Sequence, residues 1–189
     1  MQLRMNKTKA LAFSGLFTAL AVVCLILADN LLIKSSGFCF MLAAFACGYT
    51  AELCGMPFGI GSVAAAFLLG MIVSPFKLHC LTFLGLAVFT LICQYLLQRS
   101  RTDKPVSKAA AVVITMLSWN VFLAAAIALY AVFVGNIWEL TAGTVFENLP
   151  IPILIVLIII VLEALGPIIY LAYGQFINFI NRYVKYRRS

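Results

Sequence analysis

Long apolar segments follow one another along the chain, and short polar or turn-forming segments separate them. The apolar runs are continuous over about 17 to 30 residues, whereas the strands of a transmembrane barrel alternate in polarity over about 10 residues. In lipid, a spanning helix pairs its own backbone groups, and about 20 residues cross the hydrocarbon core. The pattern therefore predicts an all-α membrane protein with six transmembrane helices, which cover residues 10–28, 37–53, 58–74, 78–97, 108–134 and 150–181.

The composition supports a membrane protein and excludes a soluble or disordered one. Of the 189 residues, 65% are hydrophobic and 10% are charged. Soluble domains carry about 25% charged residues, and disordered chains combine low hydrophobicity with high charge. No segment of about 20 to 50 residues repeats along the chain, so residues 1–189 are expected to form one integral membrane domain.

The net charge of +7 comes from a one-sided distribution of basic residues. Eleven of the 13 Lys and Arg residues lie before residue 10, between residues 99 and 108, or after residue 181, and only Lys34 and Lys77 lie elsewhere. Because basic residues concentrate in cytoplasmic segments, this bias places both termini and the 98–108 linker in the cytoplasm. The same rule explains the charge without any binding of nucleic acid.

The sequence contains no motif for catalysis, metal binding or nucleotide binding. A Walker A sequence is absent, and the glycines at 59 and 61 lack the rest of a dinucleotide fingerprint. With one histidine, and six cysteines that form no CxxC pair, neither a metal site nor a cofactor is expected. We expect no enzyme activity, so a partner must supply the energy for any uphill transport.

Glu163 lies in the middle of the last predicted span, about 20 Å along the helix from Pro150. A carboxyl group at that depth is costly, and such residues usually face a cavity or a partner. Glu163 is therefore a candidate ligand or counter-ion group, and the alternative is a structural carboxyl that is protonated or hydrogen-bonded. Pro167 removes a nearby helix hydrogen bond and favours the cavity interpretation.

Other polar residues mark two further candidate positions for solute binding. Trp119 and Asn120, near the middle of the fifth span, offer a stacking face, donors and an acceptor, which suit a flat polar heterocycle. Alternatively, they pack helices together. Asp29, His79 and Glu139 lie at outer helix ends or in an outer loop. They are expected to rim an outward-facing site, unless they only end helices.

Small residues recur every four positions along the first span. Ser14 and Thr18 lie on one strip, and Gly15 and Ala19 lie on the neighbouring strip. Small side chains let transmembrane helices approach closely. The strips therefore predict either contact with a partner helix or packing within the chain.

Several features together resemble the substrate-binding S components of energy-coupling factor (ECF) transporters. The overall plan is similar: a chain of about 20 kDa, six spans, both termini inside and a basic inner loop between spans four and five. Residues 7–21 (KTKALAFSGLFTALA) look like the first span of these proteins, and residues 149–153 (LPIPI) look like the start of their sixth span.

The resemblance implies a multi-pass protein of a prokaryotic cytoplasmic membrane that captures a small vitamin-like solute from outside, near the outer ends of spans four to six. It implies a T component as a partner, contacted by the small residues of the first span, and two ATPase subunits that drive uptake. Two other functions suit the size and hydropathy: a structural subunit, such as an MreD-like cell-shape protein, and a stand-alone secondary carrier.

Cysteine labelling tests the predicted topology. In a background without the native cysteines, Ser36→Cys and Thr141→Cys are expected to react with a membrane-impermeant maleimide in intact cells, because both lie in predicted outer loops. Ser100→Cys and Ser189→Cys are expected to react only after the membrane is permeabilised. Labelling of Ser100→Cys from outside would contradict the six-span arrangement.

Overall fold

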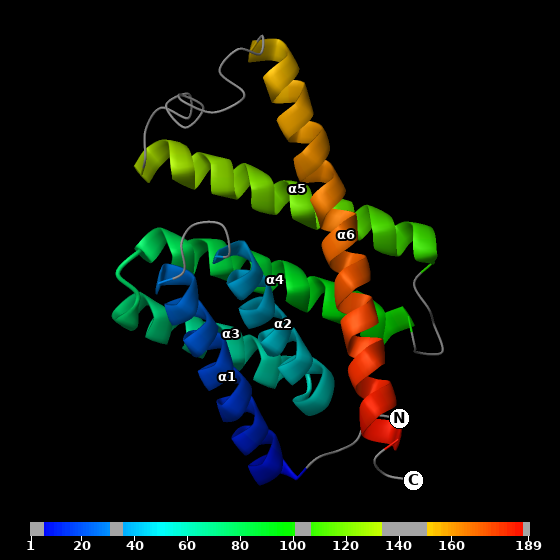
Figure 1. The fold of residues 1–189 in the computed structure, drawn as a ribbon. Helices are drawn as coiled ribbons and strands as arrows, with labels where there is room; N and C mark the ends of the chain where they lie inside the picture. The colour runs from blue at the N-terminus through cyan, green and yellow to red at the C-terminus, as the bar shows by residue number, and fades with distance from the viewer. Residues whose placement is uncertain (1–5, 31–35, 101–106, 134–150, 187–189) are drawn as a thin grey trace.

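The computed structural model describes residues 6–30, 36–100, 107–133 and 151–186, with side chains at 6–29, 37–100, 107, 110–126, 128 and 163–180. This part of the chain has six α-helices and no strand (Figure 1). They are α1 Lys7–Asn30, α2 Ser36–Cys54, α3 Met56–Val73, α4 Lys77–Ser100, α5 Lys108–Phe133 and α6 Ile151–Tyr186. The prediction of an all-helical chain is confirmed over these residues, and each predicted span coincides with one helix to within a few residues.

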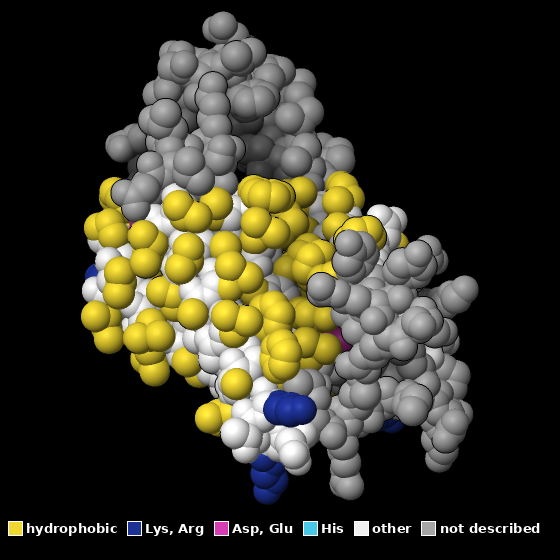
Figure 2. Space-filling view, turned by 60° about the horizontal axis from the view of Figure 1, so that its bottom comes forward, with side chains coloured by type: hydrophobic (Ala, Val, Ile, Leu, Met, Phe, Trp, Pro, Cys, Tyr) yellow, Lys and Arg dark blue, Asp and Glu magenta, His cyan; other side chains and the backbone are white. Residues whose placement is uncertain are grey.

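Four of the described helices are long and apolar enough to cross a membrane. They cover Lys7–Asp29, Gly37–Cys54, Met56–Val73 and Lys77–Ser100, and a shorter apolar stretch covers Ala110–Ala126. Figure 2 shows hydrophobic side chains over most of the described surface in view, with the few Lys and Arg side chains toward its edges. Leu16 and Ile72 are 63% and 77% exposed, as expected for side chains that contact lipid tails.

α2 lies at the centre of a tight bundle formed by the first four helices. It packs against α1, α3 and α4, and its buried face carries the small side chains of Ala43, Ala44, Cys47 and Ala51. A Cβ atom added at Gly59 of α3 would lie only 2.4 Å from Cβ of Ala51. Lipid provides little hydrophobic drive between helices, so this close backbone approach holds the bundle together through dispersion contacts.

α5 attaches to the bundle through α4, whereas α6 contacts both α4 and α2, where the ring of Tyr173 packs against that of Phe45. α5 packs on α4, and α6 packs on α5 and on α4. Two glycines permit these contacts, because Phe122 of α5 sits on Gly85 of α4 and Trp119 of α5 sits on Gly166 of α6. α6 has 36 residues, about 54 Å of helix, and it extends past the bundle at the top of Figure 1.

Residues suited to turns and caps begin and end several helices. Gly55, between α2 and α3, has a φ of 101°, which residues with a side chain rarely adopt. Pro57 follows in the first turn of α3, where its missing N–H costs nothing. Ser74 is extended and ends α3. Ser107 caps α5, because its Oγ accepts a hydrogen bond of 3.1 Å from the N–H of Ala110.

A single added methyl group tests the contact between α2 and α3. Gly59→Ala is expected to lower the midpoint of thermal unfolding, because its Cβ would meet Ala51 and force the helices apart at a cost of about 1–3 kcal/mol. Gly61→Ala is the matched control on the same helix, because its Cβ would meet nothing within 4 Å. Equal midpoints for the two variants would contradict the contact.

Candidate functional site

A cavity of about 650 Å³ lies between α4 and α5. Sites for drug-sized ligands usually measure about 300–1,000 Å³. The described lining runs along α4 from Leu78 to Ile92 and along α5 from Leu117 to Ala126, and none of these fourteen lining residues is ionisable. A smaller apolar groove of about 480 Å³ lies between α3 and α4. The α4–α5 cavity is the larger of the two and is large enough to hold a small organic molecule.

Aromatic rings form one wall of the α4–α5 cavity. Phe89 of α4 and Phe122 of α5 both line it, and Phe122 is seated directly on Gly85. The ring centroid of Trp119 lies 5.0 Å from that of Phe89 and 5.2 Å from that of Phe122. Trp119 is buried and is not among the lining residues, so it supports the cavity wall from behind.

Two hydroxyl groups are the polar side-chain groups among the described lining residues. Thr82 Oγ1 donates to the carbonyl oxygen of Leu78 at 3.1 Å. Ser118 Oγ donates to the carbonyl oxygen of Ile114 at 2.8 Å. Each hydroxyl has one proton and two lone pairs, so both protons are already used inside the helices.

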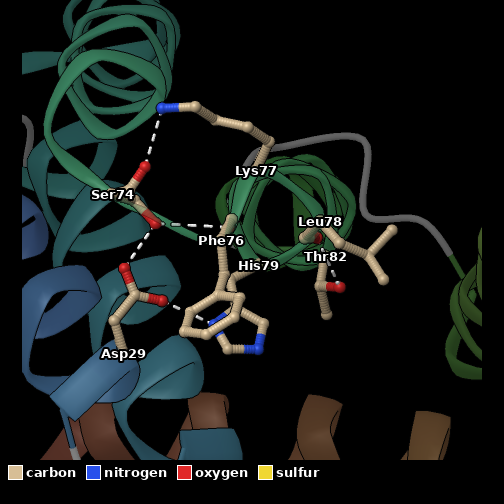
Figure 3. A network of polar contacts seen from close by, with 7 residues as sticks. All are labelled: Asp29, Ser74, Phe76, Lys77, Leu78, His79 and Thr82. Atoms are coloured by element: carbon tan, nitrogen blue, oxygen red, sulfur yellow. Dashed lines mark hydrogen bonds and ion pairs between the residues drawn. The ribbon is translucent and has the colours of Figure 1, made fainter.

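Asp29 and His79 meet where the end of α1 lies against the start of α4. Nδ1 of His79 lies 2.5 Å from Oδ1 of Asp29, and Oγ of Ser74 donates to Oδ2 of Asp29 (Figure 3). The Asp29 side chain is 2% exposed, and that of His79 is 35% exposed. Nζ of Lys77 donates to the Ser74 carbonyl at 2.7 Å. The cluster joins α1 to the α3–α4 turn, whereas Glu139 lies outside the described residues.

The start of α4 presents different side chains to its two sides. In Figure 3, His79 lies toward Asp29, while Leu78 and Thr82 point away from that carboxylate. Leu78 and Thr82 line the α4–α5 cavity. The polar cluster therefore positions the part of α4 that carries a cavity wall, but it does not place its charges in the cavity.

Glu163 and Asn120 form a separate pair between α6 and α5. Nδ2 of Asn120 lies 3.4 Å from Oε2 of Glu163 and also donates to the Met116 carbonyl at 3.1 Å. Asn120 is exposed, Glu163 is half-buried, and neither is among the residues that line the α4–α5 cavity. Pro167 has no N–H to offer the Glu163 carbonyl four residues earlier. A role of this pair in binding a solute stays a prediction.

A buried polar chain that the sequence interpretation missed connects α2, α4 and α6. The hydroxyl of Tyr173 donates to Oε1 of Gln94 at 2.7 Å, and Nε2 of Gln94 donates to Oε2 of Glu52. Tyr173 and Gln94 are fully buried. A Cβ atom added at Gly48 would lie 2.6 Å from the Tyr173 hydroxyl. The amide of Gln94 within an apolar span is the sequence signal that could have predicted these hydrogen bonds, because a buried amide needs partners.

The two small-residue strips of α1 have different surroundings. Thr18 is 8% exposed and shares a hydrogen bond of 2.8 Å with Ser62 of α3, and Ser14 is half-buried. Gly15 and Ala19 are exposed, and a Cβ atom added at Gly15 would meet nothing within 4 Å. The Ser14–Thr18 strip therefore packs within the chain, and the Gly15–Ala19 strip is open to a partner helix.

No protein-family model, characterised protein or solved structure matches the chain significantly. The described residues bear on function through one cavity and through the distribution of possible metal ligands. The α4–α5 cavity has the size and apolar walls of a site for a small molecule. Within the part of the chain that is described, no three His, Cys, Asp or Glu side chains cluster closely enough to hold a metal ion.

Removing one hydroxyl group tests whether the buried polar chain holds α6 in place. Tyr173→Phe is expected to lower the thermal unfolding midpoint by the equivalent of about 1–3 kcal/mol, because Oε1 of Gln94 loses a donor inside the protein. Tyr170→Phe is the control, since that ring is half-buried on the same helix. If both variants unfold at the same temperature, the Tyr173 hydroxyl does not hold α6.

Proposed function

We propose that this chain is the solute-binding membrane subunit of an ECF-type importer. The observation that carries the proposal is the α4–α5 cavity of about 650 Å³, whose lining is apolar and partly aromatic. A cavity of this size can hold a small vitamin-like solute. The chain contains no nucleotide-binding motif of its own, so ATPase subunits would supply the energy.

The position of the cavity along the helices supports capture from the outer side. In the proposed topology all six helices span the prokaryotic cytoplasmic membrane and both termini are cytoplasmic, so α4 begins outside and α5 ends outside. The α4 part of the lining starts at Leu78, the second residue of that helix. The α5 part runs from Leu117 to Ala126, in the middle and outer portions of the helix. The cavity then lies toward the outer face, where a solute arrives.

The candidate residues take separate roles in this proposal. Trp119 supports the aromatic wall, and Asp29 and His79 position the start of α4. Direct contact of Glu163 or Asn120 with the solute stays a prediction, because both lie outside the described lining.

The exposed strip of α1 supports a membrane partner. Gly15 and Ala19 present little more than backbone to their surroundings, which lets a second helix approach closely. Leu11, one turn before Gly15 on the same strip, and Leu16 beside the strip are 69% and 63% exposed, and their side chains would then pack against that helix. A T component that couples the chain to two ATPase subunits is the proposed occupant of this surface.

One observation favours a stand-alone secondary carrier as a second candidate. Glu163 is a carboxyl group near the middle of α6, paired with an exposed amide, and intramembrane acids of this kind often carry protons in transporters. Such a carrier would take up its solute with a proton and without ATP.

Blocking the α1 strip tests the importer role. Small molecules that copurify with the protein are identified by mass spectrometry, and their uptake is then measured in host cells that lack the chromosomal copy. Gly15→Leu is expected to retain the copurifying solute but to lose most uptake, because the leucine keeps a partner helix away. Gly61→Leu is the matched control, an exposed glycine on α3 with equally free space.

The outcomes separate the two candidate functions. Loss of both solute and uptake in Gly15→Leu would mean that the strip only supports the fold. Uptake that survives ATP depletion but stops with a protonophore would contradict the importer and support the secondary carrier.

A further inference from the structure

We infer that the ligand of the α4–α5 cavity is an uncharged, largely apolar molecule that contains a ring and offers at least one hydrogen-bond donor. This inference rests on the proposed function, because it names the class of solute that the same site would take. It is carried by the chemistry of the described cavity walls.

The cavity excludes a charged ligand because its described walls offer no counter-ion. An ion moved from water into an apolar site pays a large desolvation penalty unless it is paired. Charged groups on or beside these helices have other partners. Nζ of Lys77, next to the first lining residue, donates to two backbone carbonyl groups at the end of α3. Asp29 and His79 pair with each other across α1 and α4, and Glu163 lies against Asn120 between α5 and α6. A neutral solute avoids this penalty.

The two hydroxyl groups determine which polar group the ligand can carry. The protons of Thr82 and Ser118 are donated to carbonyl groups of their own helices. The two hydroxyl oxygens can therefore act only as hydrogen-bond acceptors toward a ligand in the cavity. A ligand N–H or O–H can therefore be satisfied there, whereas a ligand carbonyl would be left without a donor from these side chains.

The shape of the walls favours a ring. Phe89 and Phe122 line the cavity on the side supported by Trp119, and aromatic faces stack on flat ligands. One turn along α5 from Phe122, the small side chains of Ala125 and Ala126 also line the cavity and leave space. Val121 and Leu117 line the cavity and are 70% and 61% exposed, so the site opens sideways to the bilayer, through which an apolar molecule can enter.

Two probes that share one ring system test the charge requirement. N-phenyl-1-naphthylamine is neutral, apolar and has one N–H, and 8-anilino-1-naphthalenesulfonate adds a sulfonate to the same rings. Binding is measured in nanodiscs by energy transfer from Trp119, in a Trp138→Phe background that leaves one tryptophan. The neutral probe is expected to bind saturably at one site, and the sulfonate is expected to bind at least about tenfold more weakly.

Two adjacent alanines separate cavity binding from partition into lipid. Ala125 lines the cavity and Ala124 does not, and both are exposed on α5. Ala125→Phe is expected to weaken the neutral probe at least about tenfold by filling the site, and Ala124→Phe is expected to change it less than about twofold. Equal binding in both variants, or equal affinity for the two probes, would overturn the inference.

A near-isosteric variant keeps the test informative if Ala125→Phe does not fold. Thr82→Val combined with Ser118→Ala removes both acceptor oxygens and is expected to weaken the N–H probe about two- to tenfold. N-methylation of the probe should remove that difference, and a difference that persists would overturn the donor requirement. Failure of the importer role is distinguishable, because uptake without ATP would contradict that role while probe binding still reports the ligand class.

Discussion

Close backbone approach around α2 is the interaction on which the other contacts depend. Burying apolar area adds little to the stability of helix association in lipid, because lipid tails are themselves apolar. Association is stabilised instead by the close approach that short side chains allow and by hydrogen bonds between helices. Gly59 lies against Ala51 and brings α3 to α2, while Gly48 lies against the Tyr173 hydroxyl and brings α6 to the same helix. α4 packs on α2 as well, and its position determines where α5 can dock.

α4 lies between the closely packed first three helices and the larger of the two described cavities. Toward the first three helices it presents Cys80, Phe83 and Ala87, all of which are fully buried. Toward α5 it presents Gly85, on which the large ring of Phe122 rests. The ring fills the gap at that level, and the short side chains that surround it leave the remainder open as a cavity.

The helices were predictable because each apolar run is long enough to cross a bilayer and is interrupted by residues such as Gly55 and Ser74. The polar pairs were not predictable, because their members lie far apart in the sequence and meet only after packing. Asp29 and His79 were both recognised as candidates, but the structure adds their direct contact. Gln94 was missed, although an amide in an apolar span requires a partner.

The cavity itself has no signature in the sequence. The cavity exists where small side chains leave space between two helices. Whether a glycine or alanine leaves such space depends on the side chain that packs against it, which the sequence does not reveal. Trp119 was predicted either to stack on a solute or to pack helices together, and the structure adds its edge-on contact with Phe89 and its tilted contact with Phe122. Glu163 was recognised from its cost in lipid and Asn120 from the hydrogen-bonding groups of its amide, but neither signal predicts which partner the side chain finds.

The anchoring of α4 at both of its ends has a mechanical consequence. Near its first residues His79 is tied to Asp29, and near its last residues Gln94 is tied to Glu52 and Tyr173. Because α4 is held by hydrogen bonds at two positions along its length, we expect it to form the fixed wall of the cavity. α5 takes part in neither of these contacts, so a change in its tilt relative to α4 would change the width of the cavity opening.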